Sequence, residues 1–242
     1  MKKLLQCCAM MVLAGLVAVN AAAEEAPEFP QGSTPVLMVG DSMMRILGAN
    51  MEKEFRQAGI QPAVAFSSLG SGLVRPSVFN WFNRLDELLK ENKPETVFVA
   101  LGTNDKQALE TEDGAIVPYG GPAWESAYRE CIARFMDQLL AADVDLVVWF
   151  LLPPMKDPAV QEHAQIVNRI ATELAGEEAR KDKFFLYDMA SCFSRKPGVY
   201  SQYMMDQSGA AIMVRDPDGI HLAVGGAKAV AKACVKNFYK DR

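Results

Sequence analysis

Three side chains near opposite ends of the chain could form a charge-stabilised nucleophile. Ser42 ends the segment Val36-Leu-Met-Val-Gly-Asp-Ser, and Asp218 and His221 lie three positions apart in an Asp-Gly-Ile-His segment. In such a triad the serine attacks a carbonyl, the histidine takes its proton, and the acid orients and stabilises the imidazolium ring. If the two segments meet in space, the sequence predicts a serine hydrolase or an acyltransferase.

Two further segments could supply hydrogen-bond donors to an oxyanion. Gly70 lies in Ser-Leu-Gly-Ser-Gly, where the lack of a side chain lets a backbone N–H approach a ligand closely. Asn104 lies in Gly-Thr-Asn-Asp and carries a side-chain amide donor. Each residue also has a simpler interpretation, since Ser42 could cap a helix and Gly70 and Asn104 could form ordinary turns.

Two other residues have side chains suited to the same chemistry. Asp216 is the alternative to Asp218 as the acid, because it lies two positions away. His163 is the only other histidine apart from His221, and its polar neighbours in a helical pattern predict a surface position.

The elements around these residues alternate between strand and helix. Apolar runs predict strands over residues 35–40, 62–66, 96–101, 145–151 and 184–187, and helical periodicity predicts helices over 43–58, 76–92, 124–142, 159–175 and 222–239. Repeated strand–helix units predict an α/β fold, a parallel sheet in a three-layer α/β/α sandwich. Ligands of such sheets bind at the carboxyl ends of the strands, where the candidate residues fall.

The N-terminus has the features of a secretory signal peptide. A basic start is followed by an apolar stretch and Ala21-Ala22-Ala23, which predicts cleavage near Ala23 and an exported protein, periplasmic or secreted. An uncleaved membrane anchor is the alternative. Residues 24–34 form a polar, proline-containing leader, and 35–242 form one domain.

Charge and cysteine content exclude some classes. A net charge of −5 without a basic run excludes a typical nucleic-acid-binding protein. Export permits a disulfide, for which Cys192 and Cys234 are a candidate pair, with three buried thiols, including Cys131, as the alternative. No cysteine or histidine cluster predicts a metal site.

The candidate segments resemble the sequence blocks of the SGNH (GDSL-like) hydrolase superfamily, from about residue 35 to the final helix, and look most like an exported bacterial branch. The resemblance implies a flavodoxin-like five-stranded parallel sheet and no cofactor or metal. It also implies a Ser42–His221–Asp218 triad, with oxyanion donors from Ser42, Gly70 and Asn104. The first block has Met43 where the family pattern has leucine, a conservative apolar change.

Substrate contacts are less well defined by the sequence. Residues 106–122 form a long loop that we expect to overhang the site, as a lid or a fixed wall. The candidate substrate-binding residues are aromatic rings that could stack on sugars and arginines that could meet an anionic glycan: Trp81, Tyr119, Trp124, Arg75 and Arg215. The alternatives are core or rim packing for the rings and pairing with acids for the arginines.

Three functions are therefore expected in order. The first is an exported serine esterase that removes O-acetyl groups from a cell-wall or exported polysaccharide. The second is an O-acyltransferase that uses the same triad with a glycan hydroxyl as acceptor and a membrane acyl-transfer protein as acetyl donor. The third is a glycan-binding protein without catalysis, because a fold does not fix a function.

Overall fold

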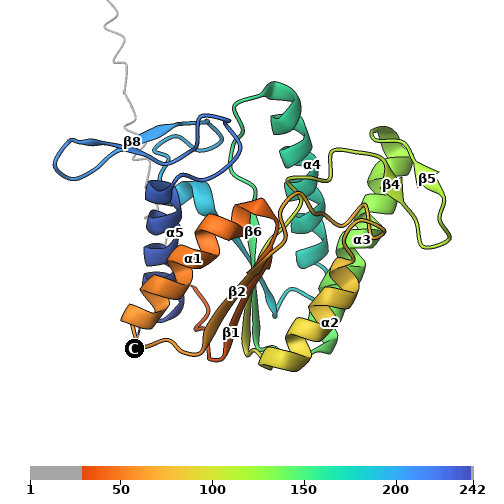
Figure 1. Ribbon diagram of the computed structural model, residues 1–242, viewed down its shortest axis with the longest axis horizontal. Helices are drawn as coiled ribbons and strands as arrows, with labels where there is room; N and C mark the ends of the chain where they lie inside the picture. The colour runs from red at the N-terminus through yellow and green to blue at the C-terminus, as the bar shows by residue number, and fades with distance from the viewer. Residues whose placement is uncertain (1–28, 241–242) are drawn as a thin grey trace, which may run out of the picture.

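Five parallel strands form the central sheet of the computed structural model, which describes residues 29–240 (Figure 1). Their order is β2-β1-β3-β6-β7, and all neighbours pair in parallel. The strands are β1 (Val36–Gly40), β2 (Ala63–Ser67), β3 (Thr96–Ala100), β6 (Leu146–Leu151) and β7 (Phe184–Asp188). The predicted strands and the parallel five-stranded sheet are confirmed; the predicted signal peptide lies outside the described residues.

Helices cover both faces of this sheet and complete the predicted three layers (Figure 1). One face carries α1 (Ser42–Gln57) and α5 (Val224–Phe238), and the other carries α2 (Trp81–Asn92), α3 (Gly121–Ala141) and α4 (Pro158–Ala175). Alternate residues of β1 enter different cores, since Leu37 and Val39 face the α2–α4 side while Val36 and Met38 face α1 and α5. This two-sided burial explains the continuous apolar run of β1.

The second helix begins later than its sequence pattern predicts. The prediction began at residue 76, whereas α2 begins at Trp81 because the Asn80 side chain accepts a hydrogen bond from Asn83 N–H and caps the helix there.

Two antiparallel hairpins and a short 3₁₀ helix were not predicted. The hairpins pair β4 (Leu109–Glu110) with β5 (Ile116–Val117) and β8 (Tyr203–Met205) with β9 (Ala211–Met213), and the 3₁₀ helix η1 spans Met189–Cys192. Strands of two or three residues are too short to show a period of two in the sequence. The hairpins lie at opposite ends of the longest dimension of the molecule (Figure 1).

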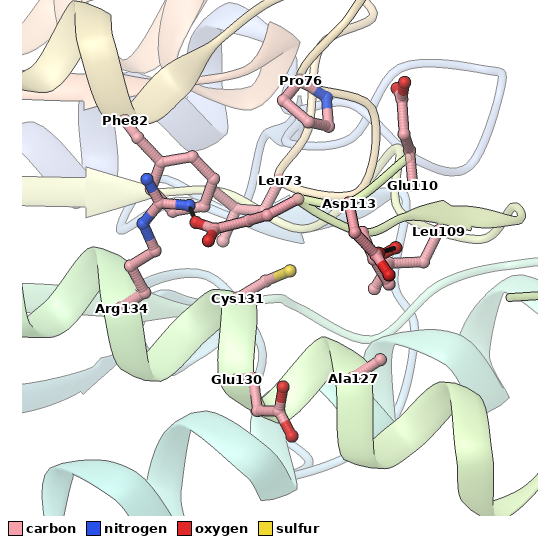
Figure 2. Close-up of a pocket in the computed structure, with 12 residues that line it drawn as sticks. Leu73, Pro76, Phe82, Leu109, Glu110, Asp113, Ala127, Glu130, Cys131 and Arg134 are labelled. Carbon is pink, nitrogen blue, oxygen red and sulfur yellow. Dashed lines mark hydrogen bonds and ion pairs between the residues drawn. The ribbon is translucent and has the colours of Figure 1, made fainter. Parts of the chain in front are cut away.

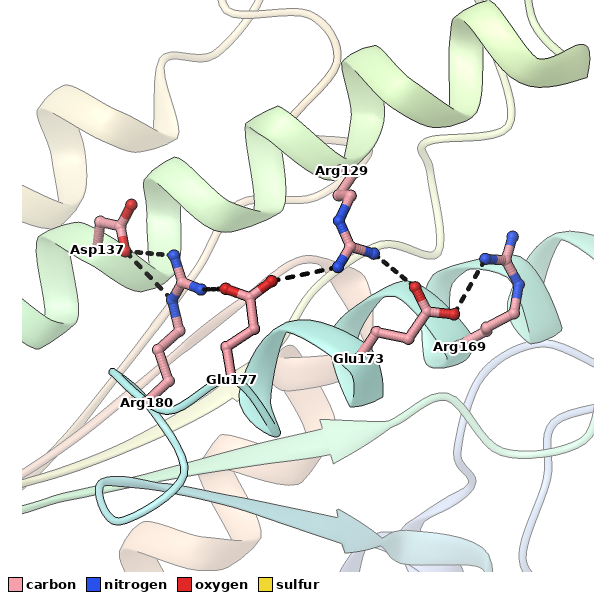
Figure 3. Close-up of polar contacts among 6 residues, drawn as sticks. All are labelled: Arg129, Asp137, Arg169, Glu173, Glu177 and Arg180. Atoms are coloured by element: carbon pink, nitrogen blue, oxygen red, sulfur yellow. Dashed lines mark hydrogen bonds and ion pairs between the residues drawn. The ribbon is translucent and has the colours of Figure 1, made fainter.

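An ion-pair ladder joins α3 to α4 and the turn that follows α4 (Figure 3). Arg129 of α3 contacts Glu173 at 2.5 Å and Glu177 at 3.2 Å. The ladder continues through Arg169 at one end and through Arg180 and Asp137 at the other. Most of its side chains are exposed to solvent, so we expect it to orient the helices more than to stabilise them.

The three cysteines within residues 29–240 are free thiols. The predicted Cys192–Cys234 pair is therefore not formed, and burial raises the pKa of Cys131 to about 12. Within the same residues, no helix is long and apolar enough to cross a membrane.

Candidate active site

Ser42 is placed at the carboxyl edge of the sheet by the end of β1. A side chain at Gly40 would meet the Ala100 carbonyl oxygen at 2.2 Å, so this strand end needs glycine to pack against β3. Asp41 then caps α1 by accepting a hydrogen bond from Met43 N–H at 2.8 Å. Ser42 is the first residue of α1, where free N–H groups and the helix dipole favour negative charge.

His221 and Asp218 meet Ser42 from the turn before α5. His221 Nε2 lies 2.7 Å from Ser42 Oγ, and His221 Nδ1 lies 2.6 Å from Asp218 Oδ2. With Nδ1 donating to the carboxylate, Nε2 is free to accept the serine proton. The structure thus brings together the three residues that the sequence predicts as a triad. Asp216, the alternative acid, instead donates its backbone N–H to the His221 carbonyl oxygen.

The Asp218 carboxylate also shapes its own turn. Its Oδ1 accepts hydrogen bonds from the backbone N–H groups of Ile220 at 2.8 Å and His221 at 3.0 Å. Partial burial raises the pKa of Asp218, but the bonds from the His221 ring and these N–H groups outweigh it, so the net pKa is lowered. The acid is therefore ionised at neutral pH.

Arg215 holds the turn that carries Asp218 and His221. Its guanidinium is 1% exposed and donates to the carbonyl oxygens of Ile220 at 2.7 Å, of Gly219 and His221 at 3.3 Å each, and of Pro154 at 2.6 Å. Burial lowers the pKa of Arg215 to about 10. The predicted contact with an anionic glycan is wrong, because this side chain is buried and donates its hydrogen bonds to backbone carbonyl oxygens inside the protein.

Gly70 and Asn104 lie on two loops that are tied to each other. Gly70 is exposed and has a φ of 67°, which favours glycine. Asn104 is half-buried and donates one amide hydrogen to the Ser71 carbonyl oxygen at 2.9 Å. Because a side-chain amide has two hydrogens, the second is available to a ligand.

Two buried carboxylates hold these loops by accepting hydrogen bonds from their backbone N–H groups. Asp105 accepts from Val74 N–H at 3.3 Å and from the Tyr128 hydroxyl at 2.8 Å, and a side chain at Gly72 would lie 1.9 Å from its Oδ1. Asp41 accepts from Thr103 N–H at 3.1 Å. Burial raises the pKa of Asp41 to about 7 and that of Asp105 to about 6. These supporting roles were not assigned from the sequence, although both acids lie inside the motifs.

Both tryptophans proposed to stack on sugars are fully buried, so those predictions are wrong. Trp81 Nε1 donates to Ser71 Oγ at 2.9 Å, and Trp124 Nε1 donates to the Gln107 carbonyl oxygen at 2.9 Å. Their large side chains bury apolar area, and each N–H anchors one of the two loops.

The remaining candidates lie around the Asn104 loop. His163 is buried, contrary to its predicted surface position, and its Nε2 lies 2.9 Å from the Gly102 carbonyl oxygen. Burial lowers the pKa of His163, which favours the neutral ring. Tyr119 is half-buried with its ring 4.8 Å from that of Trp124, and half-buried Arg75 reaches Gln107 at 3.5 Å.

The hollow around Ser42 is small and polar. It has a volume of about 190 Å³ and is lined by Ser42, Met43, Arg45, Ile46, Asp216, Asp218, His221 and Leu222. No residue of the loop 106–122 lines this hollow, and the predicted overhang stays a prediction. Figure 2 shows that residues 109–113 instead line a separate hollow of about 440 Å³ with Phe82, Cys131 and Arg134.

This arrangement suits nucleophilic acyl transfer. A serine hydroxyl is within hydrogen-bond reach of an imidazole that a carboxylate orients, at a helix N-terminus that favours an oxyanion. Within residues 29–240, no group of three or more histidine, cysteine or acidic side chains is placed to hold a metal ion.

Solved structures of several enzymes share this fold at low sequence identity. An acetyl xylan esterase from Geobacillus stearothermophilus has 14% identity and a TM-score of 0.52, covering 86% of this chain and 96% of that chain. A lipase from a goat rumen metagenome has 12% identity and a TM-score of 0.53, covering 84% and 97%. A gut microbial diltiazem-metabolizing enzyme has 14% identity and a TM-score of 0.52 over 88% of this chain, which spans about half of that protein (48%).

At the level of sequence, no curated protein matched the chain. A family model described as a protein of unknown function (DUF459) matches residues 35–237, which is nearly the whole described domain. The chain therefore belongs to the DUF459 family and has the fold of the SGNH-type hydrolases.

Proposed function

We propose that the protein is a serine esterase that hydrolyses carboxylic esters, and that its substrates are O-acetyl groups on a cell-wall or exported polysaccharide. The observation that carries this proposal is the pair of contacts from Ser42 Oγ to His221 Nε2 at 2.7 Å and from His221 Nδ1 to Asp218 Oδ2 at 2.6 Å. Both distances lie within the range expected for a nucleophile, its base and the group that orients the base.

In the proposed reaction, Ser42 Oγ attacks the ester carbonyl while His221 Nε2 takes the hydroxyl proton. The N–H groups of Ser42 and Gly70 and the second amide hydrogen of Asn104 stabilise the oxyanion. The ester C–O bond then breaks, and His221 gives the proton to the departing alcohol. Water attacks the acyl-enzyme by the same route and releases the carboxylic acid.

The preference for a short acyl group rests on the size of the site. The hollow of about 190 Å³ is bordered by the carboxylates of Asp216 and Asp218 rather than by an apolar channel. A long acyl chain would displace the water that solvates these carboxylates and would find no apolar channel to bind in its place. The polysaccharide is proposed by analogy with the similarly folded acetyl xylan esterase, together with the export predicted from residues 1–23.

Solvent access favours hydrolysis over transfer. The side chains of His221 and Asp218 are 35% and 45% exposed, so water can reach the acyl-enzyme beside the base. Transfer to a glycan hydroxyl, with a membrane protein as acetyl donor, would need an acceptor that displaces this water.

The test is p-nitrophenol release from p-nitrophenyl acetate by the chain beginning at Glu24, which contains every described residue. We expect Ser42→Ala to lower kcat by at least about 10⁴-fold with an unchanged circular dichroism spectrum. Comparable turnover by the two proteins would reject Ser42 as the nucleophile. Acetate release from acetylated xylan, and acetyl gain by an added glycan, would then separate hydrolysis from transfer.

A further inference from the structure

The hairpin β8–β9 has an apolar face that points away from the protein. Its register pairs Tyr203 with Met213 and Met205 with Ala211. Because strand side chains alternate, these four residues share one face, while Met204 and Ile212 lie on the other and pack against the core. Tyr203, Met205 and Met213 are 52%, 50% and 39% exposed, so the outward face is apolar and open to solvent.

Exposed apolar side chains are concentrated around this hairpin. Of the nine large hydrophobic side chains that are exposed within residues 29–240, five lie between positions 199 and 224. They are Val199, Tyr203, Met205, Met213 and Val224, which we call the hairpin patch. Single exposed apolar residues are ordinary, whereas a cluster of them marks an interaction surface.

Two cations border the hairpin patch. Val199, Tyr203 and Met205 line a hollow of about 280 Å³ together with Arg195 and Lys196. Both cations are exposed, and neither forms an ion pair with any residue in the described range. Asp206 is the one acid between positions 193 and 213, and its carboxylate is engaged by Ser208 and Ala210 in the hairpin turn. The segment thus carries a net positive charge in an acidic protein.

The patch is also close in sequence and structure to the candidate triad. Strand β9 leads directly through Val214 into the turn of Asp218 and His221, and Ala223 N–H bonds the Val214 carbonyl oxygen at 3.0 Å. Gly225 packs so closely on Met213 that a side chain there would meet its carbonyl oxygen at 2.5 Å. A surface that engages the hairpin would therefore lie beside the Ser42 edge.

We propose that the hairpin patch docks this protein onto a membrane surface that contains anionic lipids. Apolar side chains would enter the interface between headgroups and acyl chains, and Arg195 and Lys196 would meet lipid phosphates. The patch has five apolar side chains, whereas a stable protein–protein interface uses about 20–30 residues on each side, so its size fits a lipid surface better than a protein partner. This attachment does not depend on the proposed esterase activity.

The test is co-sedimentation of the chain beginning at Glu24 with phosphatidylglycerol-containing vesicles and with neutral phosphatidylcholine vesicles. We expect preferential binding to the anionic vesicles that weakens with salt. Arg195→Gln combined with Lys196→Gln should lower the partition coefficient about 25-fold, from about fivefold for each cation. Tyr203→Ser combined with Met205→Ser and Met213→Ser should lower it at least tenfold.

The matched control is Val78→Ser combined with Ile116→Ser, which removes two exposed apolar side chains elsewhere on the protein and should leave binding unchanged. Circular dichroism and activity on a soluble ester check each variant for folding. The proposal is overturned if wild type binds neither vesicle, or if the control lowers binding as much as the hairpin variants do. It is also overturned if sedimentation velocity shows that the hairpin variants abolish a dimer rather than vesicle binding.

Discussion

The two halves of the candidate site are held in place by buried charges of opposite sign. The turn of Asp218 and His221 is held by a cation, Arg215, which donates to carbonyl oxygens. The loops of Gly70 and Asn104 are held by anions, Asp41 and Asp105, which accept from N–H groups. A loop with unpaired carbonyl oxygens needs a buried cation to bind them, whereas a loop with unpaired N–H groups needs a buried anion.

The two supports also respond differently to pH. Burial lowers the pKa of Arg215 only to about 10, so the cation persists at any physiological pH. Burial raises the pKa values of Asp41 and Asp105 to about 7 and 6, so their charges change near neutrality. We therefore expect the turn of Asp218 and His221 to keep its shape over a wider pH range than the loops of Gly70 and Asn104.

The largest effect should come from the reacting half itself. Asp218→Asn should lower kcat on p-nitrophenyl acetate by about 10³- to 10⁴-fold, because the amide cannot hold the Nδ1–H tautomer of His221 or stabilise the imidazolium. Steady-state kinetics measures the change. Asp216→Asn is the matched control, and its kcat should stay within about threefold of wild type. An equal loss of kcat in this control would contradict the assignment of Asp218 as the acid of the triad.

Loss of the buried cation should affect the same half less strongly. Arg215→Lys should lower kcat about 10- to 100-fold with a smaller change in KM, because one ammonium cannot reach the carbonyl oxygens of Gly219, Ile220 and His221 together. In Arg215→Ala, added guanidinium at millimolar concentration should restore part of kcat. A loss of stability without any change in kcat, and without rescue, would make Arg215 purely structural.

The buried anions should be visible in the pH dependence of stability. A carboxyl whose folded pKa lies above its unfolded pKa binds more protons in the native state, so between about pH 4 and 7 the free energy of unfolding falls as pH rises. The share of Asp105 should be on the order of 3 kcal/mol. Urea titrations at several pH values should show a shallower decline for Asp105→Asn, and an identical slope would contradict the raised pKa.

The smallest effect should come from the ion-pair ladder between α3 and α4, because its charged side chains are mostly exposed to solvent. Glu173→Gln removes the shared acid between Arg129 and Arg169 and should cost less than about 1 kcal/mol of unfolding free energy. Thermal denaturation at low and high salt measures this. A cost above about 2 kcal/mol would mean that the exposed ion pairs stabilise the domain as strongly as the buried charges of Arg215, Asp41 and Asp105 do.

The sequence predicts the strands of the sheet well, but it predicts poorly which single side chains are buried and what they contact. Buried parallel strands are continuous apolar runs, so β1, β3 and β6 are visible without a structure. Ser42, Asp218 and His221 are predictable because their motifs directly follow or precede such elements. Hairpins of two or three residues per strand show no usable period.

Burial of polar and amphipathic residues could not be predicted, because it depends on partners distant in sequence. His163 is buried by a bond to Gly102, Trp81 by a bond to Ser71, and Arg215 by carbonyl oxygens that include that of Pro154. None of these partners follows from helical or strand periodicity. The predicted roles of Gly70 and Asn104 as oxyanion donors stay predictions.

The contact between Ser42 and His221 has a consequence for when the chain becomes competent. It joins residues 179 positions apart, and the base lies just before α5, which packs against the helix that begins at Ser42. A nascent chain carries the serine long before it carries the imidazole. The proposed nucleophile therefore meets its base only after almost the whole chain has been made, and formation of the pair coincides with closure of the domain.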